Sequence, residues 1–248
     1  MYDPGNANLR DVFRTRFEVV PAISSALRDE AFRIRHSVYC EDLGLEPRRD
    51  NGREFDEYDP HSTQVLLRHI ESGEFVACAR AVETDSRDRL FPLPFERASD
   101  EVLDRNLIDP RTLPRDHIVE ISRLAVIARY RHRKGEETKP YGVSEDDFGT
   151  DHRPRFPYIL VGLYFGVATI SLLQGIEYVF VLTEPRVAEH FARLGIDIAP
   201  IGRPVEDQES RIPSVIRLER LMNGMSPAVR PLFTEIQMQV RQAYAHSG

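Results

Sequence analysis

The spacing of apolar residues along the chain predicts a succession of strands and helices. Residues 118–127 are almost continuously apolar, a pattern typical of a central strand with both faces covered. Residues 24–43 carry apolar positions at helical spacing, with a serine to cap the start and Gly44 to end the helix. Further strands are expected at 15–23, 63–70, 75–82, 178–183, 196–201 and 212–218, and further helices at 99–107, 158–174, 186–194 and after Pro227.

One apolar segment, 157–182, is long enough to raise the question of a transmembrane helix. Gln174, Gly175 and Glu177 divide it into two parts. The first part is typical of a buried helix, and the second, EYVFVL, is rich in the β-branched and aromatic residues that favour strands. The pattern therefore predicts a helix followed by a central strand, with no transmembrane segment.

Composition places the chain among ordinary globular proteins, with 41% apolar and 29% charged residues. The formal net charge of −7 argues against general nucleic-acid binding. Cys40 and Cys78 have no CxxC spacing and no HExxH motif occurs, so neither a disulfide scaffold nor a bound metal is expected. The charged N-terminus lacks a signal-like apolar core, so we expect a cytoplasmic location. We expect a single domain over 1–248, with a polar insertion at about 136–156 and a helical extension at about 226–246.

Two charged residues, Glu120 and Arg123, interrupt the predicted central strand. A charge inside a buried strand is costly unless it is paired. The two residues either pair with each other, or one lies at a strand end, or they mark a polar site cut into the sheet. A basic, glycine-ended turn follows, and such a turn before a helix can hold a phosphate group on its backbone N–H groups. The charged residues of this turn that we single out are Arg129, Arg131, Arg133 and Lys134, and its glycine is Gly135.

Three further groups of polar residues are candidates for function. Arg35 and Tyr39 are four residues apart and therefore neighbours on one helix. Asp56 and Asp59 lie in the polar loop segment FDEYD, and Arg80 lies in a predicted strand. Each also has an ordinary structural interpretation: an arginine lying over a tyrosine at the surface, a solvated acidic loop, and a surface arginine in an edge strand.

The segment VEISRLAV, residues 119–126, resembles the equivalent segment of acyl-homoserine-lactone (autoinducer) synthases and N-acyl amino acid synthases of the GNAT superfamily. Within that group the chain is most similar to the acyltransferases associated with PEP-CTERM/exosortase systems. The resemblance covers most of residues 15–220 and includes the phrase HFARLGIDIAPIG. It implies an α/β fold with a mixed, mostly antiparallel central sheet and helices on both faces.

The resemblance also implies a role for each candidate residue. Glu120 and Arg123 would be catalytic, with Glu120 as the base that takes a proton from an amine. Backbone N–H groups near Val126 and Ile127, together with the basic turn 129–135, would bind the acyl donor. The residues implied to bind or orient the acceptor are Arg35, Tyr39, Asp56, Asp59 and Arg80.

The reaction implied is attack of an amine on an acyl thioester carried by an acyl carrier protein or by CoA, with no tightly bound cofactor. The first interpretation is an N-acyltransferase that makes N-acyl amino acids. The second is an acyl-homoserine-lactone synthase using S-adenosylmethionine, and the third is a non-catalytic acyl-chain-binding protein. The lactone synthases carry tryptophans where this chain has Leu45 and Val119, and the chain has no tryptophan, which favours the first interpretation.

Overall fold

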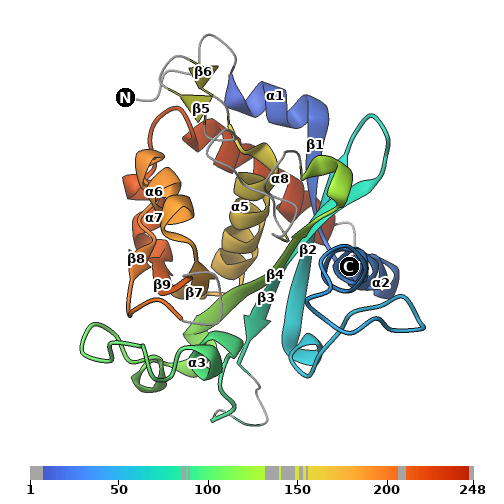
Figure 1. Ribbon diagram of the computed structural model, residues 1–248. Helices are drawn as coiled ribbons and strands as arrows, with labels where there is room; N and C mark the ends of the chain where they lie inside the picture. The colour runs from blue at the N-terminus through green and yellow to red at the C-terminus, as the bar shows by residue number, and fades with distance from the viewer. Residues whose placement is uncertain are drawn as a thin grey trace.

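A seven-stranded sheet in the order β1-β2-β3-β4-β7-β9-β8 organises the computed structural model of the protein (Figure 1). The structure describes residues 8–84, 88, 90–131, 140, 149–150, 153–154, 156–205 and 211–245. All neighbouring strands of the sheet pair antiparallel except β4 and β7, which are parallel. The strands are β1 (Phe17–Pro21), β2 (Ser62–His69), β3 (Phe75–Glu83), β4 (Ile118–Val126), β7 (Tyr178–Thr183), β8 (Ala199–Pro200) and β9 (Ile212–Arg217), and β5 (Gly149–Thr150) and β6 (Arg153–Pro154) pair separately.

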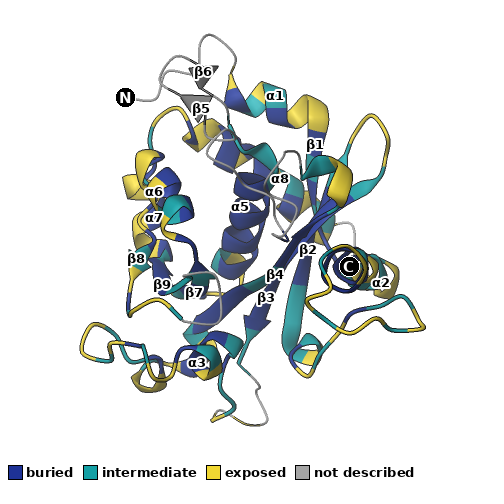
Figure 2. Cartoon of the chain, viewed as in Figure 1, coloured by how far each residue is buried: buried dark blue, intermediate teal, exposed yellow. Residues whose placement is uncertain are grey.

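Helices cover both faces of this sheet, which confirms the expected fold class. One face packs against the almost wholly buried helix α5 and against α8, as the dark colour of α5 shows (Figure 2). The other face packs against α2 at one end and α3 at the other. The helices are α1 (Leu9–Arg16), α2 (Ser25–Arg35), α3 (Pro94–Ala98), α5 (Tyr158–Leu173), α6 (Pro185–Arg193), α7 (Leu218–Gly224) and α8 (Arg230–Ala245).

Most predicted elements are confirmed within a few residues; two are not, and one helix of the structure was not predicted. The helix expected at 99–107 is wrong: the helix is α3, which precedes it, and Leu103 instead forms an isolated bridge to Gly202. The Glu96 carboxylate accepts the Leu93 N–H and so caps α3 at its start. The strand predicted at 196–201 is only the two residues of β8, and α7 was not predicted.

The predictions of a helical extension and of a polar insertion have different outcomes. The predicted C-terminal helix is present as α8, which buries Leu232, Phe233, Ile236 and Val240. The polar insertion predicted at about 136–156 lies mostly outside the described residues.

The described residues include neither a disulfide nor a metal-binding cluster. Cys40 and Cys78 are free and buried. The described part of the chain contains no cluster of potential metal ligands. Among the described helices, none is both long and apolar enough to cross a membrane.

The parallel strands β4 and β7 separate part-way along their length. Their register runs from Ile118 opposite Tyr178 to Ile121 opposite Val181 and goes no further, although both strands continue. On its other side, β4 carries one extra residue relative to β3, which makes a β-bulge. Arg123 lies in this bulge with a φ of +48°, the left-handed region that side chains other than glycine rarely adopt. The divergence and the bulge together open the sheet at its centre.

Candidate active site

Two adjoining pockets lie where β4 and β7 separate. The first, the inter-strand pocket, has a volume of about 60 Å³ and is bounded by Leu160 and Tyr164 of α5 and Val187 of α6. The second, the polar pocket, has a volume of about 490 Å³. The residues that line both pockets are Tyr39, Ile121, Ser122, Arg123, Leu182 and Arg211.

The polar pocket occupies the gap that α2 and α3 leave on their face of the sheet. In a strand, residues two apart point to the same face. Cys78 and Val82, which flank Arg80 at this spacing, pack in the clusters on the α2 and α3 side, so Arg80 projects into the gap between them. Ile118, which lies two residues before Glu120 in β4, packs in the cluster on the α3 side, so Glu120 points to the same face of the sheet. The strand period therefore brings a buried arginine and a buried carboxylate to one pocket.

Glu120 is buried and lines the polar pocket, with only 3% of its surface exposed. Its carboxylate accepts one hydrogen bond, from the backbone N–H of Phe95 at 2.7 Å. Burial raises the pKa of Glu120 to about 8, although the Phe95 N–H and the charges of Arg80 and Arg123 oppose this rise. No hydrogen bond or ion pair joins Glu120 to Arg123, so the two charges do not neutralise each other. Glu120 has the burial and the pKa expected of a general base that works near neutral pH.

Arg123 projects from the bulge toward the loop that carries Glu46, Glu54, Asp56 and Asp59, here called the acidic loop, rather than toward Glu120. Its Nη2 lies 2.8 Å from Glu46 Oε1 and 3.4 Å from Asp56 Oδ2, and its Nε lies 3.4 Å from Glu54 Oε1. Its guanidinium also lies over the Tyr39 ring, 5.4 Å from the ring centre. These contacts hold Arg123 at the rim of the polar pocket.

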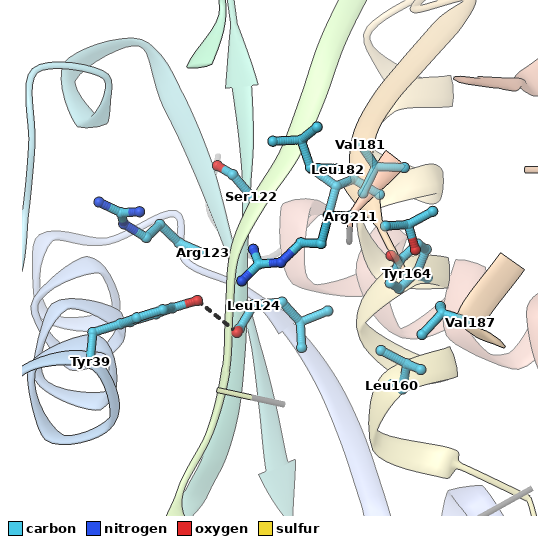
Figure 3. Close-up of a pocket in the computed structure, with 12 residues that line it drawn as sticks. Tyr39, Ser122, Arg123, Leu124, Leu160, Tyr164, Val181, Leu182, Val187 and Arg211 are labelled. Carbon is cyan, nitrogen blue, oxygen red and sulfur yellow. Dashed lines mark hydrogen bonds between the residues drawn. The ribbon is translucent and has the colours of Figure 1, made fainter. Parts of the chain in front are cut away.

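Tyr39 fixes the geometry of the bulge from the opposite side. The hydroxyl of this buried residue donates a hydrogen bond to the backbone carbonyl of Leu124 at 2.9 Å, as the dashed line in Figure 3 shows. The bulge displaces Leu124 from regular strand pairing. The hydrogen bond from Tyr39 therefore satisfies a carbonyl that would otherwise be buried without a hydrogen-bond donor. Burial raises the pKa of Tyr39 to about 12, so its hydroxyl stays protonated and remains a donor.

A buried network of ion pairs supports this face of the pocket. Arg35 Nε lies 2.5 Å from Glu54 Oε2, and its two terminal nitrogens lie 2.6 and 3.0 Å from the oxygens of Asp59. Arg80 Nη1 lies 2.5 Å from Asp56 Oδ1 and 3.2 Å from Asp59 Oδ1. Both arginines are no more than 1% exposed. The network ties α2, the acidic loop and β3 together.

Further polar contacts complete the network. Gln64 Nε2 donates to Asp59 at 2.9 Å, and Arg80 Nε donates to the Ser122 hydroxyl at 3.1 Å. Although burial opposes ionisation, the hydrogen bond and charge of Arg80 lower the pKa of Asp56 to about 2. Asp56 is therefore an anion at any physiological pH.

The predicted acceptor-binding residues divide into two groups. Tyr39, Asp56 and Arg80 line the polar pocket. Arg35 and Asp59 do not: their side chains are 0% and 5% exposed and lie behind the pocket in the buried network. Two structural interpretations from the sequence are wrong, because Arg35 is not at the surface and Arg80 is not in an edge strand.

The predicted donor-binding residues make contacts within the protein. The Val126 N–H donates to Pro140 O at 2.8 Å and the Ile127 N–H to Val76 O at 3.0 Å, so both backbone donors are already bonded. Arg129 forms an ion pair with Glu74, and Arg131, whose side chain is 6% exposed, pairs with Asp42. Arg133, Lys134 and Gly135 lie outside the described residues.

Sequence reasoning missed several residues of this site. Glu54 and Glu46 neutralise Arg35 and Arg123, and the Phe95 N–H binds Glu120 from a connection that carries no visible motif. Arg211 lines both pockets from the start of β9. A lone arginine before a strand gives no signal in the sequence, since only the fold brings it to the cleft.

Residues 34–139 match the family model described as an acetyltransferase (GNAT) domain. The matched region contains Glu120, Arg123 and the buried network, and the match together with the fold supports an acyltransferase. No curated protein sequence matches the chain.

Solved structures share the fold of the chain well beyond the matched region. The chain is 18% identical to the AHL synthase LasI over 85% of this chain and 95% of that one, with a TM-score of 0.54. It is 19% identical to BjaI, a CoA-dependent acyl-homoserine lactone synthase solved with SAM and isopentyl-CoA, covering 90% and 89% of the two chains with a TM-score of 0.54. It is 14% identical to FeeM, an N-acyl amino acid synthase from uncultured soil microbes, covering 85% and 94% with a TM-score of 0.52. At these identities the similarity establishes a common fold.

Proposed function

We propose that the protein is an N-acyltransferase that moves a fatty acyl group from a carrier-protein or CoA thioester to the amine of an amino acid or similar small molecule. The observation that carries this proposal is the position of Glu120. It lines the polar pocket beside the point where the inter-strand pocket adjoins it. An acceptor in the polar pocket and a thioester between β4 and β7 would meet there.

The chemistry of acyl transfer requires a base at this point. The amine nitrogen forms a bond to the thioester carbonyl carbon, the C–S bond breaks, and the amine loses a proton while the thiol departs with one. Glu120 is placed to take the amine proton, directly or through a water molecule. The apolar walls of the inter-strand pocket, Leu160, Val181 and Val187, suit the alkyl part of a donor. No covalent enzyme intermediate is needed.

The polar pocket favours an amine that carries charge. Asp56 is ionised and lines this pocket, so an ammonium group can approach its carboxylate beside the ion pairs that Asp56 makes with Arg80 and Arg123. Of the two positions at which the lactone synthases carry tryptophan, Leu45 lines the pocket, whereas Val119 is fully buried in the core. The absence of tryptophan therefore affects the acceptor pocket through Leu45 only. The loss of one aromatic side chain from the pocket, at Leu45, still favours an amino acid over S-adenosylmethionine.

Two alternatives predict different outcomes for the reaction. A lactone synthase would use S-adenosylmethionine, and a non-catalytic protein would bind an acyl chain without turnover. The second alternative is disfavoured because a binding protein has no use for a buried carboxylate with a pKa of about 8. We propose in addition an association with PEP-CTERM/exosortase systems, which the resemblance of the sequence implies, a cytoplasmic location and a single-domain organisation.

The first prediction concerns the acceptor. Incubation with long-chain acyl carrier protein or acyl-CoA and the common amino acids should give N-acyl amino acids, detected by mass spectrometry. S-adenosylmethionine offered in place of the amino acids should give little or no acyl-homoserine lactone. A lactone product without any N-acyl amino acid would show that the acceptor has been assigned wrongly.

The second prediction concerns the donor. We propose that four basic residues form part of a surface that binds acidic acyl carrier protein or CoA phosphates. They are Arg129, Arg131, Arg133 and Lys134. Arg129 is the described residue of this surface that remains accessible, with 56% of its side chain exposed. Arg129→Glu with Arg133→Glu should weaken donor binding by roughly tenfold at low salt and by much less at high salt, because exposed charges are screened.

Binding of acyl carrier protein at several salt concentrations measures this effect. Arg220→Glu is the matched control, since Arg220 is an exposed arginine of α7. Donor affinity that responds equally to salt in the double variant, the control and the unmodified protein would contradict the proposed surface.

A further inference from the structure

Arg211 differs from the other arginines of the cleft in having no partner among the residues that the structure describes. Its side chain forms no hydrogen bond or ion pair with any residue that the structure describes, and its Nε is buried without an acceptor. Figure 3 shows it reaching from the β9 side of the cleft toward β4, near Leu124. Its positive charge acts on both Tyr39 and Tyr164, which lie on opposite sides of the opening, and tends to lower the pKa of each.

The remaining arginines that line the polar pocket are already neutralised. Arg80 pairs with Asp56 and Asp59, and Arg123 pairs with Glu46, Glu54 and Asp56. Among the described residues that line this pocket, Arg211 is therefore the cation without a bound anion. A partly buried guanidinium without partners is unfavourable, and an anionic ligand group would relieve that cost.

Chemistry selects the kind of anionic group. A guanidinium binds both oxygens of a carboxylate through parallel hydrogen bonds, a geometry that lysine cannot provide. The acids that line the same pocket are Glu46, Asp56 and Glu120, and the first two are already paired with Arg123 and Arg80. The charge of this pocket that lacks a described partner is therefore the positive charge of Arg211, which suits an acceptor that carries a carboxylate.

We propose that Arg211 binds the carboxylate of the acceptor and thereby selects amino acids over simple amines. The inference rests on the proposed acyl transfer, and it assigns the carboxylate to Arg211 rather than to Arg35 or Arg80, whose guanidinium groups are buried in ion pairs. No other described residue of the cleft offers an uncommitted guanidinium.

A binding experiment tests this site independently of turnover. The probes are N-dodecanoylglycine and N-methyldodecanamide, which differ only in the carboxylate and carry no side chain that could clash. The unmodified protein should bind the first probe tenfold or more tightly than the second, because charge-assisted hydrogen bonds contribute about 1.5–3 kcal/mol. Arg211→Gln should remove that preference and leave the affinity for N-methyldodecanamide within about twofold. Arg211→Lys should keep part of the preference, because it retains the charge without the planar fork.

A matched control separates local from general charge effects. Arg203→Gln removes the same charge from an exposed arginine close in sequence and should leave the preference unchanged. Equal weakening of both probes in Arg211→Gln, or a carboxylate preference that survives the substitution, would overturn the proposal. Absence of any preference in the unmodified protein would overturn it as well.

Turnover distinguishes failure of this site from failure of the proposed function. With the best amino acid and its decarboxylated amine as acceptors, Arg211→Gln should raise KM for the amino acid and leave kcat/KM for the amine unchanged. A fall in kcat that is equal for both acceptors would place Arg211 at the thioester and refute its role toward the carboxylate. A carboxylate preference in binding without any N-acyl product would instead refute the acyltransfer and leave the site standing.

Discussion

Replacing Glu120 with glutamine is expected to lower kcat by roughly two to four orders of magnitude while the protein stays folded, because general-base help in proton transfer contributes about that much. Glutamine has nearly the same shape and can still accept the Phe95 N–H, which binds the carboxylate at 2.7 Å in the unmodified protein. Single-turnover acyl transfer with a saturating donor measures the chemical step. Glu219→Gln, at an exposed site on α7, is the matched control.

The pH dependence sharpens this test. The base must be ionised to act, and burial raises the pKa of Glu120 to about 8, so activity should rise with pH through about 8. The Glu120→Gln variant should lack that step. A folded variant with unchanged turnover, or an activity profile of the unmodified protein that is flat between pH 6 and 9, would refute the assignment of the base.

Stability should change with pH in the opposite sense. Because the pKa of Glu120 is raised above its ordinary value of 4.5, the folded state holds the neutral acid more strongly than the unfolded state does. This stabilisation is fully present below about pH 4.5 and is lost as the pH rises through about 8. Glutamine is always neutral, so the variant should gain in Tm relative to the unmodified protein between pH 5 and pH 9.

Replacing Asp59 with alanine is expected to have the largest effect on stability, about 3–5 kcal/mol of the free energy of unfolding. Removal of one partner of a buried ion pair leaves an uncompensated buried charge. Asp59 accepts two hydrogen bonds from Arg35 and one from Gln64, and it lies 3.2 Å from Arg80. Its loss leaves Arg35 with Glu54 alone and weakens the pairing of Arg80.

Chemical denaturation of the purified variant measures this loss. Asp50→Ala provides the control, since Asp50 is an exposed aspartate of the same loop region and should change the free energy of unfolding by less than about 0.5 kcal/mol. Equal stability of the Asp59 and Asp50 variants would show that the network does not hold the acidic loop to the sheet.

Local sequence pattern was sufficient to predict the elements that carry the site. The continuous apolar run of β4 identified a covered central strand, and the two charges within it marked the place where the sheet opens. Helical spacing identified α2, α5 and α8 because a buried face repeats every three to four residues. The helix predicted at 99–107 does not form, because its mostly polar residues contribute little stabilising burial. The Glu96 carboxylate instead caps α3, which favours a helix at that earlier position.

Only the tertiary structure decided which charges neutralise each other. Arg35 and Glu54 are 19 residues apart, Arg80 and Asp56 are 24 apart, and the Phe95 N–H reaches Glu120 across 25. No local pattern specifies such pairs, because they depend on how β3, β4 and the acidic loop meet in space. The same contacts commit Arg80 to an internal role and leave Arg211 without a partner within the described part of the chain. The sequence by itself thus determined the strand, the fold and the position of the proposed base, while packing determined which arginines are committed to ion pairs.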